Sequence, residues 1–490
     1  MTHHIDLQSI AHRAMINAGF APDFSSDALD QLHAINNQTP PEIHAAQTRD
    51  LRSLLWSSID NTQSRDLDQV EYAEALPDGS IRVLIGIADV DAFVSRGSAL
   101  DFFARENTTS VYTGVRTFPM LPDEISSGIT SLLGDVDRHG IVIEYAVDAG
   151  GALASIEVYR ALLRNKAQMT YETVGAWLDQ KADAPNAFAK LPGLEAQIRL
   201  QLEAANRLRA LRIKNGALSF ETIEAQPVIQ DGRVVDLSVT EHNSARDIIE
   251  NFMIAANSAV ASFLEARGVA SIRRVVRQPE RWPRIVELAA TFGAQLPAAP
   301  NARALADFLA ARKAADPAHF PDVSLAVVKL LGPGEYVVEQ PGVTPENEGG
   351  HFGLAVPDYT HATAPNRRYA DLITQRLIKA VIDDEAAPYS VDELTLIAAR
   401  CTERENAARK VARMMRKVAA AELFSNRIGD EFDAIVTGAA DKGTFVRTIA
   451  PPVDGRVVRG EAGLDVGDKV RVRLLSTDSQ RGFIDFARAG

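Results

Sequence analysis

Three aspartates, Asp60, Asp66 and Asp68, lie within nine residues of one another in the segment SSIDNTQSRDLDQ. The apolar stretches on either side, 54–59 and 80–90, have the β-branched content and partial alternation of strands. Asp60 is then expected where a strand ends, and Asp66 and Asp68 lie on one side of an extended segment. Clustered carboxylates of this kind suit a hard divalent cation, and magnesium acting on phosphates is the usual case. Solvated turns and helix caps are more frequent uses of such a loop, so spacing alone leaves both interpretations open.

Composition restricts the class of protein that the chain can form. With 490 residues it is long enough for two or three domains. No apolar run approaches the ~18 residues that a membrane span requires, and the N-terminus lacks a signal core, so we expect a cytoplasmic protein without membrane association. A single cysteine, Cys401, rules out an internal disulfide framework and is interpreted as an incidental thiol. The net charge of −13 argues against indiscriminate coating of nucleic acid, although a local basic channel remains compatible with it.

The pattern of apolar residues predicts an α+β protein in three parts. Residues 1–49 form a small helical N-terminal module, and 50–427 form one large domain with strands first and helices later. A 3.6-residue period marks a helix over 244–268, and further helices are predicted over 365–383 and 391–425. The stripe of the first helix should be buried; its members are Ile248, Ile249, Phe252, Met253, Ala256, Val260 and Phe263.

Residues 428–490 change character and predict a separate small barrel. Short alternating segments separated by Gly and Asp turns are typical of a five-stranded OB-fold. Such barrels often bind single-stranded nucleic acid, and Phe445 and Phe483 beside Arg447 and Arg481 favour RNA. An SH3-like or purely structural barrel is the alternative.

Four segments, in order, resemble the ribonuclease II/ribonuclease R (RNB) family of 3′-to-5′ exoribonucleases. The acidic loop is similar to the magnesium motif of that family, and the block from IADVDAF to SSGITSL is similar to the one that follows it. MIAAN (253–257) resembles part of the central helix. The last segment, HFGLAVPDYTHATAPNRRYADLITQRL, resembles the signature before and within a late helix.

This resemblance implies a role for each residue of the acidic loop. Asp60, Asp66 and Asp68 match the metal-binding and catalytic aspartates, with Asp68 at the position that is indispensable for the chemistry. Gln69 occupies the place of a fourth aspartate and would complete the ligand set through its amide oxygen. The implied cofactor is Mg²⁺, with Mn²⁺ as a substitute. Arg367 matches the arginine that contacts the scissile phosphate, and we expect it in the first turn of the helix opened by Pro365.

The resemblance also implies an RNA-binding surface. Tyr112 and Phe220 match an aromatic pair that clamps the terminal bases by stacking, which is indifferent to sequence. Tyr171 and Glu250 match residues that contact the ribose and select RNA over DNA.

The chain departs from the family pattern at several positions. Besides Gln69, Ala408 stands where many members have a glutamate, and Ala364 and Asn366 replace a serine and a hydrophobic residue. The sequence begins with about 45 helical residues in place of two cold-shock barrels. These departures bear on RNA entry and on substrate preference.

The expected activity is magnesium-dependent, processive 3′-to-5′ hydrolysis of single-stranded RNA to nucleoside 5′-monophosphates by a monomer. A second hypothesis is a catalytically weakened RNA-binding protein, for which Gln69 and Ala408 are the motivation. A third is a metal-dependent phosphatase or transferase that uses Asp66 and Asp68, which leaves the barrel and the aromatic positions without a role.

Overall fold

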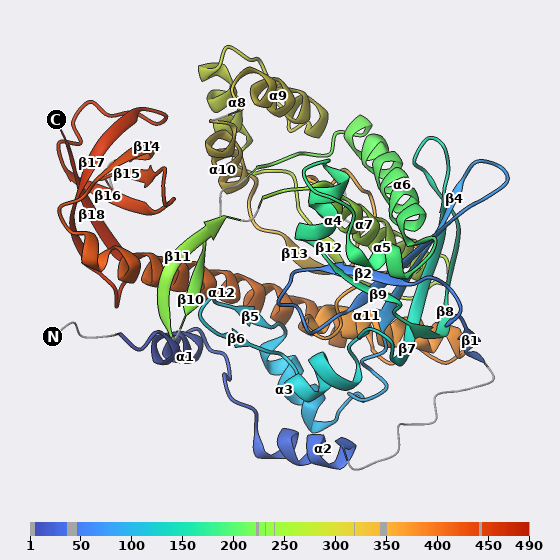
Figure 1. Cartoon of the computed structure of the whole chain (residues 1–490). Coiled ribbons are helices and arrows are strands. Elements are labelled where there is room, and N and C mark those ends of the chain that lie inside the picture. The colour runs from blue at the N-terminus through green and yellow to red at the C-terminus, as the bar shows by residue number, and fades with distance from the viewer. Residues whose placement is uncertain are drawn as a thin grey trace.

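A mixed sheet of seven strands forms the centre of the molecule in the computed structural model (Figure 1). Strands β8, β7, β4, β3 and β2 pair in antiparallel order, and β1 and β9 add a parallel strand at each edge. The residues described are 5–36, 47–221, 225–230, 232–239, 241–317, 319–343, 350–440 and 443–489. The sheet strands are β1 (Arg49–Asp50), β2 (Ser57–Asp60), β3 (Gln69–Ala75), β4 (Ile81–Ala88), β7 (Asp137–Val147), β8 (Leu153–Arg164) and β9 (Ala167–Thr170).

The apolar run of β4 is buried along nearly its whole length, which is why the sequence reads there as continuously hydrophobic. The segment before β2 is shorter as a strand than predicted. Pairing begins at Ser57, while Trp56 turns its indole Nε1 to the carbonyl of Leu51 at 2.8 Å. Strand β2, which ends at Asp60, is therefore only four residues long.

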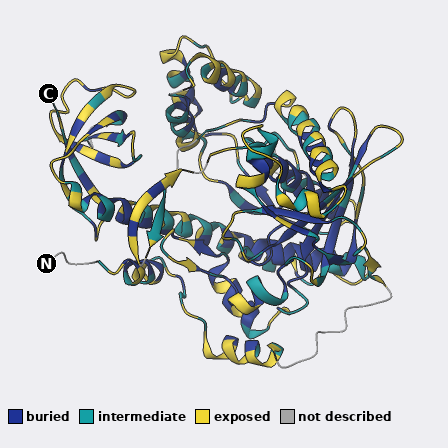
Figure 2. Cartoon of the chain, viewed as in Figure 1, coloured by how far each residue is buried: buried dark blue, intermediate teal, exposed yellow. Residues whose placement is uncertain are grey.

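Two helices, α7 (Ser244–Glu265) and α11 (Tyr369–Ile382), cover the sheet and carry much of the core (Figure 2). The Tyr145 hydroxyl of β7 donates to the carbonyl of Phe252 at 3.4 Å, which fixes α7 against the sheet. The Gln375 side chain of α11 donates to the carbonyl of Ala88 at 2.8 Å. The predicted stripe of α7 is buried except at Met253, which is partly exposed.

A helix of 34 residues, α12 (Val391–Phe424), begins at a capping box of Ser390 and Glu393. It runs from beneath the sheet to the C-terminal barrel (Figure 1). In the N-terminal region, α1 (Leu7–Asn17) packs on α12, and α2 (Ser26–Asn36) packs on α3 (Ala99–Asn107). The helical character predicted for this region is confirmed for these residues, whereas residues 37–46 lie outside the described part.

Three more helices form a group with a separate hydrophobic cluster built around Trp282, Ile285 and Phe320. A separate core for these three helices was not predicted from the sequence. This group consists of α8 (Trp282–Thr291), α9 (Ala302–Ala315) and α10 (Phe320–Leu331). The remaining elements of this part are β5 (Val111–Tyr112), β6 (Thr117–Phe118), η2 (Glu124–Ile129), α4 (Tyr171–Leu178), α5 (Asn186–Lys190), α6 (Leu194–Lys214), β10 (Ala225–Gln230), β11 (Arg233–Val239), β12 (Ser271–Val275) and β13 (Glu335–Glu339).

The C-terminal segment closes into a barrel with strand order β14-β15-β16-β18-β17. The α+β class and the five-stranded C-terminal barrel predicted from the sequence are therefore confirmed. A short helix, η3 (Ser425–Arg427), joins α12 to the barrel. The barrel strands are β14 (Glu431–Ala440), β15 (Gly443–Thr448), β16 (Asp454–Arg459), β17 (Lys469–Asp478) and β18 (Phe483–Arg488).

Candidate active site

The three aspartates of the acidic loop line one cavity of about 340 Å³, between the ends of β2 and β3 and the start of α7. Asp60 is the last residue of β2, and Asp68 immediately precedes β3. The structure therefore brings together, from the predicted set, the carboxylates and four more side chains. The predicted residues that line the cavity are Asp60, Asp66, Asp68, Gln69, Tyr112, Tyr171 and Arg367.

Asp60 is held by its own loop. Its Oδ1 accepts hydrogen bonds from the backbone N–H of Asn61 at 2.7 Å and from the Ser64 hydroxyl at 2.9 Å. Burial raises the pKa of Asp60, and these two hydrogen bonds oppose that effect. The carboxylate is thus preorganised at the end of a strand.

Asp68 is the most buried of the three carboxylates, with only 1% of its surface exposed. The backbone N–H of Asn366 donates to its Oδ1 at 3.1 Å, and the guanidinium Nε of Arg367 donates to its Oδ2 at 3.3 Å. Burial raises the pKa of Asp68 to about 7, against the opposing attraction of Arg367. A cation in the cavity would stabilise the charged form of this buried carboxylate.

Arg367 does not lie in a helix, and the expected helix start at Pro365 is wrong. Helix α11 begins at Tyr369, and Arg368 is its extended N-cap residue. The reason is tertiary: the carbonyl of Arg367 accepts from the N–H of Ser110 at 3.0 Å, and Tyr369 donates to Thr108 at 2.8 Å. Arg367 therefore reaches the cavity from a turn, and the anion-binding amides of a helix N-terminus do not surround it.

Tyr112 and Asp66 meet at the rim of the cavity. The Tyr112 hydroxyl donates to Oδ2 of Asp66 at 3.2 Å, while 47% of the tyrosine remains exposed. The position suits a surface that receives another planar group.

Tyr171 is the first residue of α4, and its ring is covered by the guanidinium of Arg246 at 4.2 Å from the ring centre. The same guanidinium donates to the side-chain oxygen of Asn61 at 3.2 Å. Arg246 was not anticipated from the sequence. The sequence signal that could have identified Arg246 is its spacing from Ile249 and Met253. Residues at this spacing share one face of a helix, and here that face of α7 lines the cavity.

Phe220 and Glu250 lie away from this cavity lining. Phe220 packs against the hydrophobic cluster of α8, α9 and α10. Glu250 is an exposed residue of α7 whose carboxylate lies 3.7 Å from the guanidinium of Arg212. Their roles at a bound nucleotide therefore stay predictions.

Two other positions from the sequence analysis lie in α12. Ala408 is partly buried and packs against the hydrophobic cluster that α12 shares with α1 and the C-terminal barrel. Cys401 is buried, and burial raises the pKa of its thiol to about 12. The burial of Cys401 and the raised pKa of its thiol both fit the interpretation of this residue as an unreactive thiol.

The barrel presents Phe445 and Phe483 with 41% and 58% of their surface exposed. Arg481 is largely exposed, whereas Arg447 is engaged by Asp454 at 3.0 Å and by Asp322 of α10 at 3.9 Å. Two exposed aromatic rings on one small barrel are suited to stacking with flat groups. Arg447 instead contributes to the contact between the barrel and α10.

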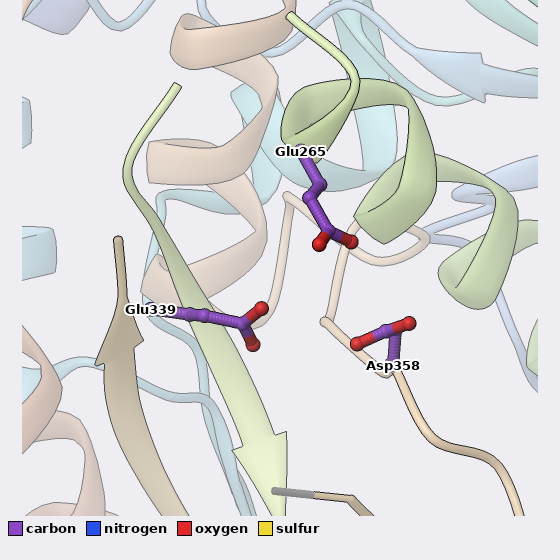
Figure 3. Close-up of side chains that lie close together, drawn as sticks. All are labelled: Glu265, Glu339 and Asp358. Atoms are coloured by element: carbon purple, nitrogen blue, oxygen red, sulfur yellow. The ribbon is translucent and has the colours of Figure 1, made fainter. Parts of the chain in front are cut away.

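The predicted donor set fits a hard cation in chemical type. Three carboxylates and an amide oxygen surround one cavity, with room for water and further oxygen ligands. Among the described residues, a different acidic group has oxygens that all lie within 4.8 Å of one another, formed by Glu265, Glu339 and Asp358 (Figure 3). The guanidinium of Arg273 lies 3.2 Å from Glu339 and offsets part of its charge.

Among the helices described, none has the length and apolar character needed to cross a membrane.

Comparison with known proteins gives two matching family models. Residues 48–384 match the RNB domain, and residues 430–489 match the RNase II-type exonuclease C-terminal S1 domain.

Ribonuclease R 1 of Lactococcus lactis is 29% identical over 503 residues, which cover 95% of this chain and 59% of that protein. The chain thus spans less than two thirds of the length of this relative. Mycoplasma genitalium RNase R, solved with ribose-methylated single-stranded RNA, superimposes with a TM-score of 0.87 at 23% identity, over 99% of this chain and 78% of that one.

Yeast Ssd1, described as a pseudonuclease, has the same fold with a TM-score of 0.71 at 16% identity, over 92% of this chain and 55% of that one. The fold by itself is thus compatible with both the presence and the loss of nuclease activity. On the extent of the family match, which covers more than half of its residues, the chain belongs to the RNB-domain family.

Proposed function

We propose that this protein is a magnesium-dependent, processive exoribonuclease that hydrolyses single-stranded RNA from its 3′ end and releases nucleoside 5′-monophosphates. One observation carries the proposal: Asp60, Asp66 and Asp68 share a cavity with Arg367, whose guanidinium lies 3.3 Å from Asp68. Metal-binding carboxylates beside an arginine are the components that phosphodiester hydrolysis requires.

In this proposal Asp60, Asp66, Asp68 and Gln69 hold the cation. Magnesium, when bound, would polarise the scissile phosphate and lower the pKa of an attacking water. Asp68 is kept in place by the N–H of Asn366 and by Arg367, so its second role is to orient that arginine. The guanidinium neutralises negative charge that develops on the phosphate oxygens, and its planar donors suit two of them at once.

RNA is the proposed substrate because the surfaces beside the cavity suit bases and ribose. The exposed ring of Tyr112 can stack on a terminal base. Phe220, Tyr171 and Glu250 are proposed to contact the nucleotide or its ribose once RNA is bound. Processivity is supported by the separation of the sites: the barrel lies at the far end of α12 and offers a second attachment for the same strand (Figure 1).

A second candidate function is RNA binding without cleavage. It is favoured by Gln69, which puts a neutral amide into a cation site, and by the likeness of the fold to a pseudonuclease. The retained carboxylates and Arg367 argue for the enzyme. A monomer in the cytoplasm remains part of the proposal.

The deciding experiment incubates 3′-labelled single-stranded RNA with the purified protein, with magnesium or with EDTA. Magnesium-dependent release of labelled mononucleotide supports the exoribonuclease. Retention of RNA without release supports the binding protein. Neither binding nor release would favour a small-molecule phosphatase or transferase, and a phosphate-ester substrate would then be tested.

A further inference from the structure

A second arginine, Arg246 of α7, lines the cavity that holds the three aspartates. The two arginines contact the acidic loop at opposite ends. Arg246 donates from Nη2 to Oδ1 of Asn61 at 3.2 Å, just after β2, whereas Arg367 donates to Asp68 at 3.3 Å, just before β3. Only Arg367 takes part in the reaction as described above, so the cavity contains a cationic side chain whose role is open.

The guanidinium of Arg246 is held in place before any ligand binds. It lies over the ring of Tyr171, at 4.2 Å from the ring centre, and its hydrogen bond to Asn61 fixes one edge. Its Nε is buried without a partner, so a ligand in the cavity would have to use the terminal nitrogens. A cation whose orientation is already set binds an anion at a lower cost in side-chain entropy.

The positive charge of Arg246 is only weakly neutralised within the protein. Among the described residues its one ion pair is with Glu172, at 3.7 Å, and that carboxylate is 58% exposed. A long ion pair with an exposed partner contributes little. The next residue in the chain, Asp247, is engaged by His242 at 2.9 Å and by Arg209 at 3.5 Å. Arg246 therefore keeps its charge available for a ligand.

The position of Arg246 in its helix is unfavourable for a cation. Asn243 is the N-cap residue of α7, and its side chain accepts from the N–H of Arg246 at 3.1 Å, which places Arg246 in the first turn. The N-terminus of a helix carries a partial positive charge that disfavours cations and favours anions. A residue that breaks this local rule while lining a cavity is expected to serve function.

A strand whose 3′ end lies at the aspartates offers Arg246 one further phosphate. Arg367 is assigned to the scissile phosphate, and beyond it towards the 3′ end there is only the terminal nucleoside. The neighbouring phosphate is therefore on the 5′ side. We propose that Arg246 binds this phosphate, one linkage before the scissile bond, and so fixes which linkage of the strand lies at the aspartates. The inference rests on the proposed function, in which this cavity receives the 3′ end of RNA.

The test measures the affinity of short single-stranded RNA in EDTA, which removes the cation on which the proposed cleavage depends. Each probe carries one neutral methylphosphonate, at the last, second-last or third-last linkage. Neutralising the second-last linkage should weaken binding to the parent about ten-fold, the lower end for a lost hydrogen bond between charged groups. Arg246→Gln should bind unmodified RNA about ten-fold more weakly, and the second-last methylphosphonate should weaken it no further.

Two variants separate this role from a structural one. Arg199→Gln is the matched control, because Arg199 of α6 lies over Trp177 of α4 at 4.4 Å from the ring centre but does not line this cavity. It should behave like the parent with every probe. Arg246→Lys keeps the positive charge, so the second-last methylphosphonate should still weaken its binding. Circular dichroism establishes that each variant is folded.

The inference is overturned if the second-last methylphosphonate does not weaken binding to the parent, or weakens Arg246→Gln as much as the parent. Arg246 would then only support Tyr171. An effect of Arg246→Gln confined to another linkage would contradict the assignment as well. If the parent shows the expected pattern but releases no nucleotide with magnesium, the exoribonuclease proposal fails while the role of Arg246 stands. A parent that binds no RNA would overturn both.

Discussion

The guanidinium Nε of Arg367 lies 3.3 Å from Oδ2 of Asp68, although the two residues are 299 positions apart in the chain. The Asp68 side chain is only 2% exposed, whereas that of Arg367 is 43% exposed. The buried carboxylate therefore anchors a cation whose other donors remain available to the cavity. This arrangement couples the position of the arginine to the charge of the aspartate.

Asp68→Asn should abolish RNA cleavage and leave RNA binding within a few-fold of the parent. The substitution removes the charge that serves the cation and the chemical step, while the barrel and the aromatic surface still supply affinity. Single-turnover cleavage and filter binding measure the two quantities separately. Substantial turnover in the purified variant would contradict the role given to Asp68.

Arg367→Lys should lower the single-turnover rate by about 100-fold, with a smaller change in RNA affinity. Lysine keeps the positive charge but cannot donate to two phosphate oxygens and hold Asp68 at the same time, and loss of one such donor costs on the order of 10²–10³ in rate. Arg284→Lys on the exposed surface of α8 is the control. A rate within two-fold of the parent, roughly 0.4 kcal/mol, would show that Arg367 provides charge alone.

Tyr112→Ala should lengthen the final product by a few nucleotides, whereas Tyr112→Phe should not. Short RNA is retained by few contacts, and stacking on each base contributes roughly 1–3 kcal/mol. Phenylalanine keeps the ring and loses only the hydrogen bond to Asp66. Product lengths are resolved on a sequencing gel, and an identical pattern for the alanine variant would exclude Tyr112 from base stacking.

Gln69→Asp should lower the magnesium concentration that gives half-maximal cleavage, provided that the shorter side chain reaches the ion. An amide oxygen binds a divalent cation more weakly than a carboxylate, and magnesium is sensitive to ligand charge because it must shed part of its water. Cleavage rates are titrated with magnesium for both proteins, and RNA binding is the control. An equal or higher requirement would indicate that Gln69 orients water or substrate.

Stability should fall on acidification partly through His351. Burial lowers the pKa of His351 to about 4, and its Nδ1 accepts a hydrogen bond from Leu354 N–H at 3.1 Å. The unfolded chain, with a histidine pKa near ~6.5, binds more protons between about pH 6.5 and 4, so stability is lost as the pH falls through that window. From pH 7 to 5 this histidine should cost up to about 2 kcal/mol.

Urea unfolding of the parent and of His351→Asn at pH 7 and pH 5 checks this. The variant should lose less stability than the parent between the two pH values, by about that amount. The same loss in both proteins would show that His351 is not protonated in the unfolding transition.

The local patterns in the sequence determined much of this protein. The acidic loop, the stripe of α7 and the alternating strands of the barrel depend on neighbouring residues, because strand and helix periodicities place side chains on faces within a few positions. For the same reason Asp60 was expected at a strand end and Asp66 and Asp68 on one side of the loop. Gln69 was identified as the neutral member of the set only through the resemblance to the RNB family.

Contacts between distant segments decided the rest. Arg367 lies in a turn because its carbonyl bonds to Ser110, and Arg246 reaches the cavity because Asn61 and Tyr171 receive it. Such features depend on which remote groups remain to satisfy a buried charge, and no local periodicity encodes that.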